Sequence, residues 1–278
     1  RVVFRPLLDR GIDTHIIVGN HDIFYKQSLK INSPGLNLTE FSNVQTYSSP
    51  QTVKIKGKEV FVIPWVCEEN AEEFVEMRDQ SKAKVAMGHL EIAGFYANST
   101  YQVQHGLDMG IFSQFDQVFS GHYHKKNSSG NICYLGNPYQ MYWNDEGDTR
   151  GFHIFDLETH ELEFIANPNV MFNKIYYNES KQRLINPNRY KDSYVKLIVE
   201  GKSTPQRLTA LIDKLYKVGI HDLKVIENFE LSVDEDVEVE AEDTLTTLTN
   251  YVNAMDAEVN KENIIDIFKS LYVEAQEV

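Results

Sequence analysis

Three short segments of the chain place histidine close after a glycine, each at the end of an apolar run. The segments are Gly19-Asn20-His21-Asp22, Gly88-His89-Leu90-Glu91 and Gly121-His122-Tyr123-His124. Imidazole nitrogens suit Mn, Fe, Zn and Ni ions, and the amide of Asn20 offers a neutral oxygen ligand. A glycine lets the backbone approach a site closely where a side chain would obstruct it. The repeated pattern predicts a metal site assembled from separate segments.

The spacing of His122 and His124 supports this interpretation. In extended chain, residues i and i+2 project from the same face, so both imidazoles can reach one metal, or two metals about 3.5–4 Å apart. A single histidine more often has a structural role, and the threefold repetition is what favours metal binding. We expect a structural role for the histidines without this context: His15, His105, His153, His160 and His221.

Strands have to deliver these loops to a common place. Short runs rich in β-branched and aromatic residues are typical of buried strands. The expected strands are His15–Val18, Val60–Ile63, Val85–Met87, Val118–Phe119, Ile132–Leu135 and Phe152–Phe155. Glu68–Gln80 is predicted as a helix and Thr159–Ala166 as the second arm of a hairpin. Because strand ends in an α/β sheet gather at one edge, a layered α/β domain would bring the three motifs together.

Length and composition bound the class of protein. A chain of 278 residues with 42% apolar residues suggests a globular protein of roughly two domains. No apolar run approaches the ~20 residues that cross a bilayer, which excludes a membrane-spanning protein. Cys67 and Cys133 stand far apart, which excludes a disulfide scaffold and a thiolate zinc site. Two reduced, packed thiols in a cytoplasmic protein are the simplest interpretation.

The net charge of −14 is unevenly distributed along the chain. Residues 1–168 carry 14 basic and 21 acidic residues, a net charge of −7. Residues 169–222 carry ten basic and five acidic residues, a net of +5, whereas residues 223–278 carry three and fifteen, a net of −12. Net charge alone therefore does not exclude a polyanionic substrate, and the blocks indicate separate functional regions.

The middle block is predicted to form a small α+β lobe within residues 169–231. A strand at Tyr194–Glu200 precedes a helix that begins at Pro205 and runs to about Val218, and Leu223–Ile226 is a plausible closing strand. Basic side chains on this lobe favour a phosphate backbone, although a solvated surface explains any one of them equally well. The candidates for contact with such a backbone are Lys196, Lys202 and Arg207.

The last block begins with an acidic linker over residues 232–243 and continues with two amphipathic helical patterns over residues 244–278. Two short helices beyond a tether bury little by themselves. They either fold back on the body or supply a face for a partner, and the pattern favours the partner. The residues expected on that face are Leu248, Tyr251, Met255, Ile264, Phe268 and Leu271.

The ordered motifs G-N-H-D, G-H and G-H-x-H resemble those of the calcineurin-like metallophosphoesterases. The longer strings from Ile17 to Asp22, from Ile63 to Asn70 and from Val118 to His124 are similar to SbcD-type nuclease subunits, among them the recombination endonuclease subunits of T-even-like phages. Arg150-Gly151-Phe152 and Leu271–Ala275 extend the likeness to nearly the whole chain. The resemblance implies an α/β fold: a metallophosphoesterase β-sandwich flanked by helices, a small α+β capping domain and C-terminal helices.

The resemblance also implies residue roles. Asn20, His89 and His122 would ligate a second metal and His124 a first metal, with Mn²⁺ the ion expected at both positions. His21 would contact the scissile phosphate and assist the leaving group, and Asp22 would orient His21. The family mechanism is attack of a metal-activated water on phosphorus.

The chain departs from the family pattern at its start. The superfamily has D-x-H and G-D-x-x-D upstream of G-N-H-D, and neither occurs in the eighteen residues before Gly19. The resemblance therefore predicts an N-terminally truncated nuclease subunit with three ligands for one metal and one for the other. We expect such a chain by itself to be inactive or nearly so.

The resemblance gives the other blocks a meaning as well. The middle lobe would help to place DNA over the metals, and the terminal helices would dock on an SbcC-type coiled-coil ATPase. The expected assembly is a homodimer within a heterotetramer that processes DNA ends in recombination and repair, in the bacterial cytoplasm if phage-encoded. Two alternatives remain open: a metallophosphoesterase for small phosphodiesters or phosphoproteins, and an inactive scaffold that binds only the ATPase.

Overall fold

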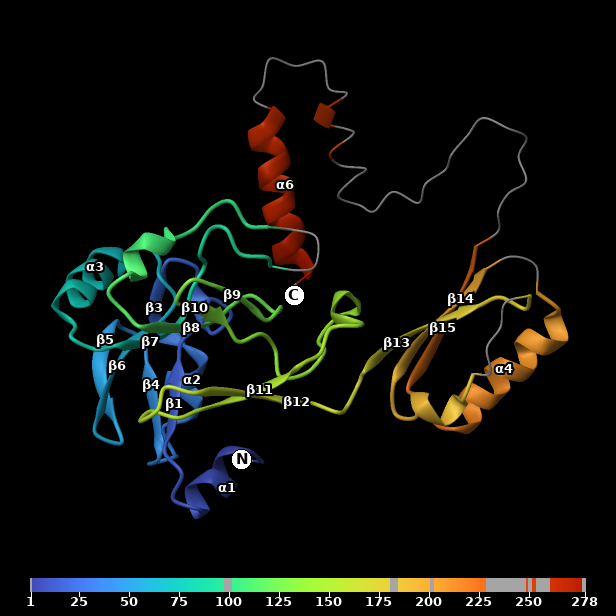
Figure 1. Ribbon diagram of the computed structural model, residues 1–278, viewed down its shortest axis with the longest axis horizontal. Coiled ribbons are helices and arrows are strands. Elements are labelled where there is room, and N and C mark those ends of the chain that lie inside the picture. The colour runs from blue at the N-terminus through green and yellow to red at the C-terminus, as the bar shows by residue number, and fades with distance from the viewer. Residues whose placement is uncertain are drawn as a thin grey trace. The chain divides into compact units, whose positions relative to one another are not determined.

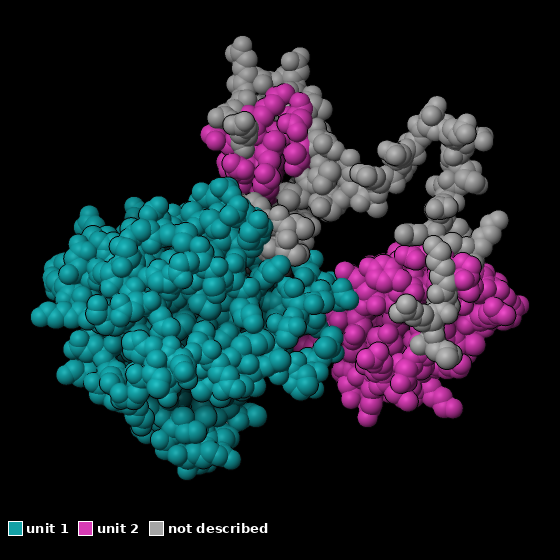
Figure 2. Space-filling model, viewed as in Figure 1, with its two compact units in different colours: residues 1–170 teal, residues 171–278 magenta. Residues whose placement is uncertain are grey.

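The computed structural model describes residues 2–97, 102–180, 185–200, 203–228, 249, 252–253 and 261–276. The chain divides into two compact units, Arg1–Val170 and Met171–Val278 (Figure 2). No helix in the described ranges is long and apolar enough to span a membrane.

The centre of unit 1 is a six-stranded mixed sheet (Figure 1). Four neighbouring strands run parallel, and an antiparallel strand closes each edge. In sheet order the strands are β5 (Gln51–Ile55), β6 (Lys58–Ile63), β7 (Val85–His89), β8 (Gln117–Gly121), β10 (Ile132–Tyr134) and β9 (Asn127–Ser129). The carboxyl ends of β6, β7 and β8 therefore meet at one edge of the sheet, as the sequence predicted.

Side chains from several elements bury both faces of the central strands. Val60, Phe61, Val62 and Ile63 on β6 are each at most 1% exposed. On one face, the packed cluster includes side chains from β1 (Thr14–Ile17), β4 (Val44–Tyr47), β11 (Gly151–Phe155) and β12 (Leu162–Ala166). β1 pairs in parallel with β4, and β11 forms the expected antiparallel hairpin with β12. This arrangement confirms a mixed α/β fold.

Helix α3 (Ala71–Gln80) connects β6 to β7 and begins three residues later than the sequence predicted. The reason is Asn70, whose Oδ1 accepts a hydrogen bond from the Cys67 amide at 2.8 Å and whose Nδ2 donates to the Trp65 carbonyl at 3.0 Å. These bonds hold residues 65–70 as a loop, because an asparagine side chain competes with helical backbone bonding.

The remaining elements of unit 1 lie around the sheet. They are α1 (Phe4–Asp9), the hairpin of β2 (Ile23–Tyr25) and β3 (Ser28–Asn32), α2 (Ser33–Asn37), and the 3₁₀ turns η1 (Met109–Phe112) and η2 (Trp143–Asp145). The chain after β1 lies beside the end of β6, because the Val18 amide donates to the Tyr47 carbonyl and the Val18 carbonyl accepts from the Trp65 amide at 2.8 Å. The loop that follows Val18 is thereby held next to the strand ends.

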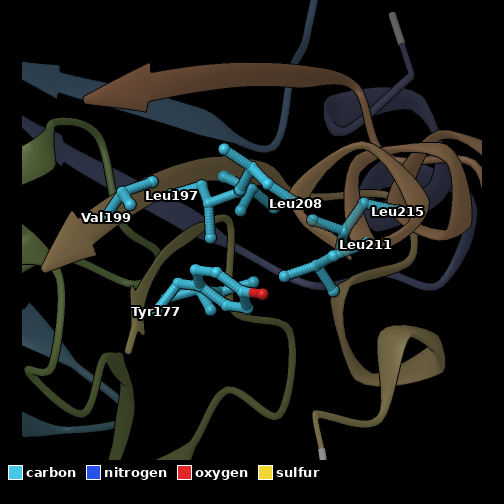
Figure 3. Packing of buried hydrophobic residues seen from close by; sticks show 8 residues of the cluster. Tyr177, Leu197, Val199, Leu208, Leu211 and Leu215 are labelled. Carbon is cyan, nitrogen blue, oxygen red and sulfur yellow. The ribbon is translucent and has the colours of Figure 1, made fainter. Parts of the chain in front are cut away.

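Unit 2 contains a three-stranded parallel sheet of β13 (Phe172–Tyr177), β14 (Tyr194–Glu200) and β15 (Asp222–Asn228). Helix α4 (Pro205–Lys217) follows the 3₁₀ turn η3 (Pro187–Tyr190) and β14, and it packs on one face of the sheet. Figure 3 shows Leu208, Leu211 and Leu215 of α4 facing Leu197, Val199 and Tyr177. Strand β13 was not predicted, because Asn173 and Lys174 interrupt its apolar run.

The terminal region of unit 2 is described only in part. Residues 249 and 252–253 are helical, and α6 (Lys261–Gln276) matches the second amphipathic pattern. The residues Leu248, Tyr251 and Met255 of the predicted partner face lie outside the described residues. Ile264 and Phe268 lie on α6 and are half-buried, and Leu271 occupies a helical position of α6.

Candidate metal centre at the strand ends

The three histidine motifs lie at strand ends: one follows β1, and the other two begin within the last residues of β7 and β8, which extend two residues further than the sequence predicted. His89 is the last residue of β7, whereas His122 follows the last residue of β8, Gly121. The register pairs His89 with Gly121, so the two neighbouring strands end together. The parallel sheet thus brings ligand-type side chains from distant parts of the chain to one edge.

Asn20 and His89 are in direct contact. The Oδ1 atom of Asn20 lies 2.8 Å from Nε2 of His89, although 69 positions separate the two residues in the chain. The His89 ring fits against two glycines: a Cβ on Gly19 would lie 2.9 Å from the ring, and one on Gly121 would lie 3.2 Å from Nδ1. The absence of side chains at these glycines is therefore what gives the imidazole room.

His122 lies beside His89, with 5.3 Å between the two ring centroids. Its φ angle is 87°, in the left-handed region that non-glycine residues seldom occupy. Trp65, just after β6, packs against both imidazoles, with centroid distances of 6.2 Å to His89 and 5.2 Å to His122. An unfavourable backbone conformation held by its surroundings is typical of functional sites.

Burial keeps these two imidazoles neutral. It is the main cause that lowers the pKa of His89 to about 4 and that of His122 to about 3. Nearby His21 and His124 lower both pKa values further, whereas Asp22 opposes the shift at His89. At neutral pH both rings are uncharged, which is the state that binds a metal ion.

His21 and Asp22 lie in the tight loop after β1. The carboxylate of Asp22 accepts a hydrogen bond from the Gly19 amide at 2.8 Å, and the Asp22 amide donates to the Gly19 carbonyl at 3.1 Å. His21 is exposed. The loop therefore presents the His21 side chain at the surface directly beside Asn20.

His124 belongs to the same neighbourhood but makes different contacts. Its ring stacks on Tyr142 with 5.8 Å between centroids and 7° between planes. Its pKa is lowered chiefly by burial, and the nearby charges oppose one another, since Asp145 raises the pKa and Arg150 lowers it. The guanidinium of Arg150 also donates a hydrogen bond to the backbone carbonyl of His124.

The arrangement is a partial ligand set. Asn20, His89 and His122 lie together, and His21 and His124 are close enough to affect their charge state. Across the described ranges, no three His, Cys, Asp or Glu side chains converge as a group that could hold a metal ion. The two imidazoles and one amide oxygen nevertheless match the donor types that first-row divalent ions accept.

Sequence reasoning assigned no role to four residues around these histidines. They are Trp65, Tyr142, Asp145 and Arg150. Only Trp65 and Arg150 lay in strings that carried a family resemblance. The contacts of Trp65, Tyr142 and Arg150 with the histidines join segments distant in sequence, which no local pattern reveals, and Asp145 reaches this group through Arg150 and Tyr142.

Unit 2 carries the predicted DNA-contact residues that the structure describes. Lys174, Lys196 and Lys224 stand opposite one another across β13, β14 and β15, so they form a row of lysines that we call the lysine row. Burial and the other two lysines lower the pKa of Lys196. Arg207 on α4 is exposed and lies 3.8 Å from Glu179, and Lys202 falls outside the described residues.

Comparison with known proteins relates the chain to a phage enzyme. No protein-family model matches it. Exonuclease subunit 1 of Enterobacteria phage T4 is 35% identical over 279 residues, which cover 99% of this chain and 80% of that protein. The match spans both units and all three histidine motifs. On this identity and coverage, the chain belongs to the same phage recombination nuclease family as exonuclease subunit 1 of phage T4.

Proposed function

We propose that this protein is a nuclease subunit that hydrolyses DNA phosphodiester bonds with two divalent metal ions, preferably Mn²⁺. The observation that carries the proposal is the contact among Asn20, His89 and His122 at one sheet edge, in a chain whose relative is an exonuclease subunit. The fold expected for this chemistry is the calcineurin-like metallophosphoesterase sandwich. The packing of β1, β4, β11 and β12 on one face of the six-stranded sheet is compatible with it.

The residues present fit one metal well. His89 and His122 are neutral at pH 7 and offer nitrogen lone pairs, and Asn20 offers its amide oxygen. His124 would serve the other metal. When bound, the metals would supply a Lewis acid and an activated water.

The chain's own residues then do two further things. His21 is exposed beside Asn20, where it would contact the scissile phosphate and give a proton to the leaving oxygen. The loop closed by Asp22 and Gly19 would keep the His21 backbone in one position, which serves the orienting role expected of Asp22.

Unit 2 would position the DNA. Three lysines directly opposite one another concentrate positive charge, and Lys224 and Lys174 lower the pKa of Lys196, so an anion placed on the lysine row would be attracted to it. A phosphate backbone supplies such an anion, and neutralised phosphates release counterions. Exposed Tyr176 follows Lys174 by two positions on the same strand, so it adds an aromatic surface to the same sheet face. Lys202 and Arg207 would supply further contacts outside the lysine row, since α4, which carries Arg207, packs on the other face of the sheet.

The helices after the acidic linker would bind an SbcC-type coiled-coil ATPase. The phage T4 relative is named as subunit 1, which indicates an enzyme of more than one subunit. Ile264 and Phe268 share a face of α6 at helical spacing. A homodimer within a heterotetramer, acting in recombination and repair in the host cytoplasm, completes the proposal.

The test is cleavage of end-labelled linear duplex DNA by the protein expressed from its complete reading frame. We expect cleavage with Mn²⁺, no cleavage with EDTA, and loss of cleavage in His122→Gln. A small nucleotide phosphodiester serves as the competing substrate. Preference for that compound over DNA would indicate a different metallophosphoesterase. Absence of any hydrolysis, together with co-purification of the ATPase, would indicate a scaffold.

A further inference from the structure

A buried ion pair lies next to the His124 loop in unit 1. Arg150 is 7% exposed and Asp145 is 4% exposed, and Nη2 of Arg150 lies 2.7 Å from Oδ1 of Asp145. The same nitrogen lies 3.2 Å from Oδ2 of Asp148. Burial of such a pair contributes little stability compared with apolar packing of the same volume, because both charges lose their hydration. Its position therefore calls for a role other than stability.

One guanidinium group connects this pair to the predicted metal ligand. Nη1 of Arg150 donates to the backbone carbonyl of His124, which also accepts from the Asn137 amide at 3.0 Å. Gly136, at a φ of +71°, passes so close that a Cβ on it would lie 2.9 Å from that carbonyl oxygen. The carbonyl of His124 is thus held by two donors, and the lack of a side chain at residue 136 leaves room for this arrangement.

The carboxylate of Asp145 holds the other side of the same histidine. Its Oδ2 accepts from the Met141 amide at 2.7 Å and from the Tyr142 amide at 3.2 Å. Tyr142 is the residue on which the His124 imidazole stacks. Through Asp145 the ion pair therefore holds the backbone of Tyr142, whose ring stacks on His124, and through Arg150 it holds the backbone of His124.

We propose that Arg150 and Asp145 are a positioning pair that holds the His124 imidazole in one orientation for the divalent cation and DNA phosphate bound at the strand ends. The proposal rests on the proposed nuclease function and adds two residues to its machinery. Neither residue touches substrate; both act through His124. Groups that orient a metal-binding histidine before the metal arrives typically change metal affinity or activity ~10–100-fold when removed.

Two variants separate positioning from simple stability. Arg150→Lys keeps the buried charge, but a single ammonium group lacks the planar fork that spans His124, Asp145 and Asp148. Asp145→Asn keeps an oxygen for the amides of Met141 and Tyr142 and removes the charge. The matched control is Arg78→Lys, because Arg78 is also largely buried and pairs at 2.6 Å with a carboxylate, that of Asp79 on α3.

The first measurement is the NMR signal of the His124 ring in the metal-free protein, assigned from its loss in His124→Gln. Stacking on Tyr142 shifts the ring protons upfield. We expect Arg150→Lys and Asp145→Asn to reduce this shift, while Arg78→Lys leaves it unchanged. Unchanged His124 signals in both folded variants would overturn the proposal. If Arg150→Lys does not fold, Asp145→Asn decides.

The second measurement is a double-mutant cycle on Mn²⁺ affinity. Arg150→Lys is expected to weaken Mn²⁺ binding ~10–100-fold in the wild-type background and less than about twofold in His124→Ala. Equal losses in both backgrounds would overturn the proposal, because the pair would then act elsewhere. Cleavage assays should show the corresponding loss in kcat with KM for DNA unchanged.

The two proposals fail in different ways. If the variants change the His124 signal but the protein never cleaves DNA, the positioning proposal stands and the nuclease proposal is contradicted. If the protein cleaves DNA with Mn²⁺ and both Arg150→Lys and Asp145→Asn leave this cleavage intact, the nuclease proposal stands and the positioning proposal is contradicted.

Discussion

Units 1 and 2 are both built on parallel strands, yet they place their polar groups on different parts of the sheet. In unit 1 the ligand-type residues lie at strand ends, as His89 at the end of β7 and His122 after β8. In unit 2 the lysine row crosses the middle of the strands on one face. The first arrangement concentrates chemistry at a point, and the second spreads charge over a surface.

Burial explains the difference. Strand β6 is buried at four consecutive positions, so both of its faces are covered and only its end can carry a polar side chain. Strand β14 alternates between buried and less buried positions, because α4 packs on only one face of its sheet. A strand of the second kind can place cations at every other position. A metal ion is bound by side chains that converge at one place, such as the strand ends of unit 1. A polymer backbone is bound by charges spread along a surface, such as the sheet face of unit 2.

The largest effect is expected from removing a ligand at the strand ends. His89→Gln or His122→Gln should weaken Mn²⁺ binding by more than the ~10–100-fold typical of outer residues, because a lone pair itself is lost. Isothermal titration of Mn²⁺ measures this. The control is His153→Gln, since His153 packs on Phe164 at 5.0 Å and we predict a structural role for it. Equal affinity for Mn²⁺ in all three variants would contradict a metal centre at the strand ends.

A large effect is also expected on stability at low pH. Because burial lowers the folded-state pKa of His89 to about 4 and of His122 to about 3, the unfolded state binds more protons below its own pKa of about 6.5. In metal-free protein this stabilisation is complete above pH 6.5 and is lost as pH falls towards 3. Its size is several kcal/mol for the two rings together, since each pKa unit corresponds to about 1.4 kcal/mol.

Denaturant titration at several pH values tests this expectation. The double variant His89→Gln, His122→Gln should lose stability less steeply between pH 6.5 and 4 than the wild type. His221→Gln in unit 2 is the control and should keep the wild-type slope. If the free energy of unfolding of the double variant depends on pH as steeply as that of the wild type, these rings do not control the acid sensitivity of the protein.

The strands and the gathering of their ends could be predicted from sequence, because both depend on local patterns. Apolar runs located β7 and β8, although both strands continue two residues beyond the runs, and parallel topology placed His89 beside His122. The start of α3 could not be predicted, because it depends on two hydrogen bonds of one side chain, Asn70. The α/β class follows from patterns, whereas exact boundaries follow from individual contacts.

The supporting part of the site could not be predicted for a similar reason. Arg150 reaches the His124 carbonyl across 26 positions of the chain, and Trp65, just after β6, packs against His122, just after β8. No spacing rule connects such residues before the chain is folded. The signal available in sequence was the lack of a side chain at Gly19 and Gly121, which indicated close packing without naming the neighbour.

An intermediate effect is expected from filling the space beside His89. A Cβ at Gly19 would lie 2.9 Å from the ring, whereas one at Gly121 would lie 3.2 Å away, a gap that small shifts can relieve. Gly19→Ala should therefore lengthen the contact between His89 and Asn20 and weaken Mn²⁺ binding ~10-fold or more. Gly121→Ala should have a clearly smaller effect. The reverse order, or no effect of either, would contradict the geometry at the strand ends.

The smallest effect is expected from one lysine of the lysine row. Lys224→Gln should reduce the salt dependence of DNA binding by about one unit of the log–log slope, since one phosphate contact is lost. The same change should raise the free energy of unfolding by ~0.2–1 kcal/mol, because it relieves repulsion by Lys196. Fluorescence anisotropy at several salt concentrations and denaturant titration measure the two effects.

The control is Lys191→Gln, an exposed lysine of unit 2 outside the lysine row. An opposite change in binding and stability, present in Lys224→Gln and absent in Lys191→Gln, distinguishes a surface built for a polyanion from a general positive charge. Equal effects of both variants would show that unit 2 binds DNA through its total positive charge and not through the position of the lysine row. Unit 1 would then be the part of the molecule in which the placement of individual residues determines function.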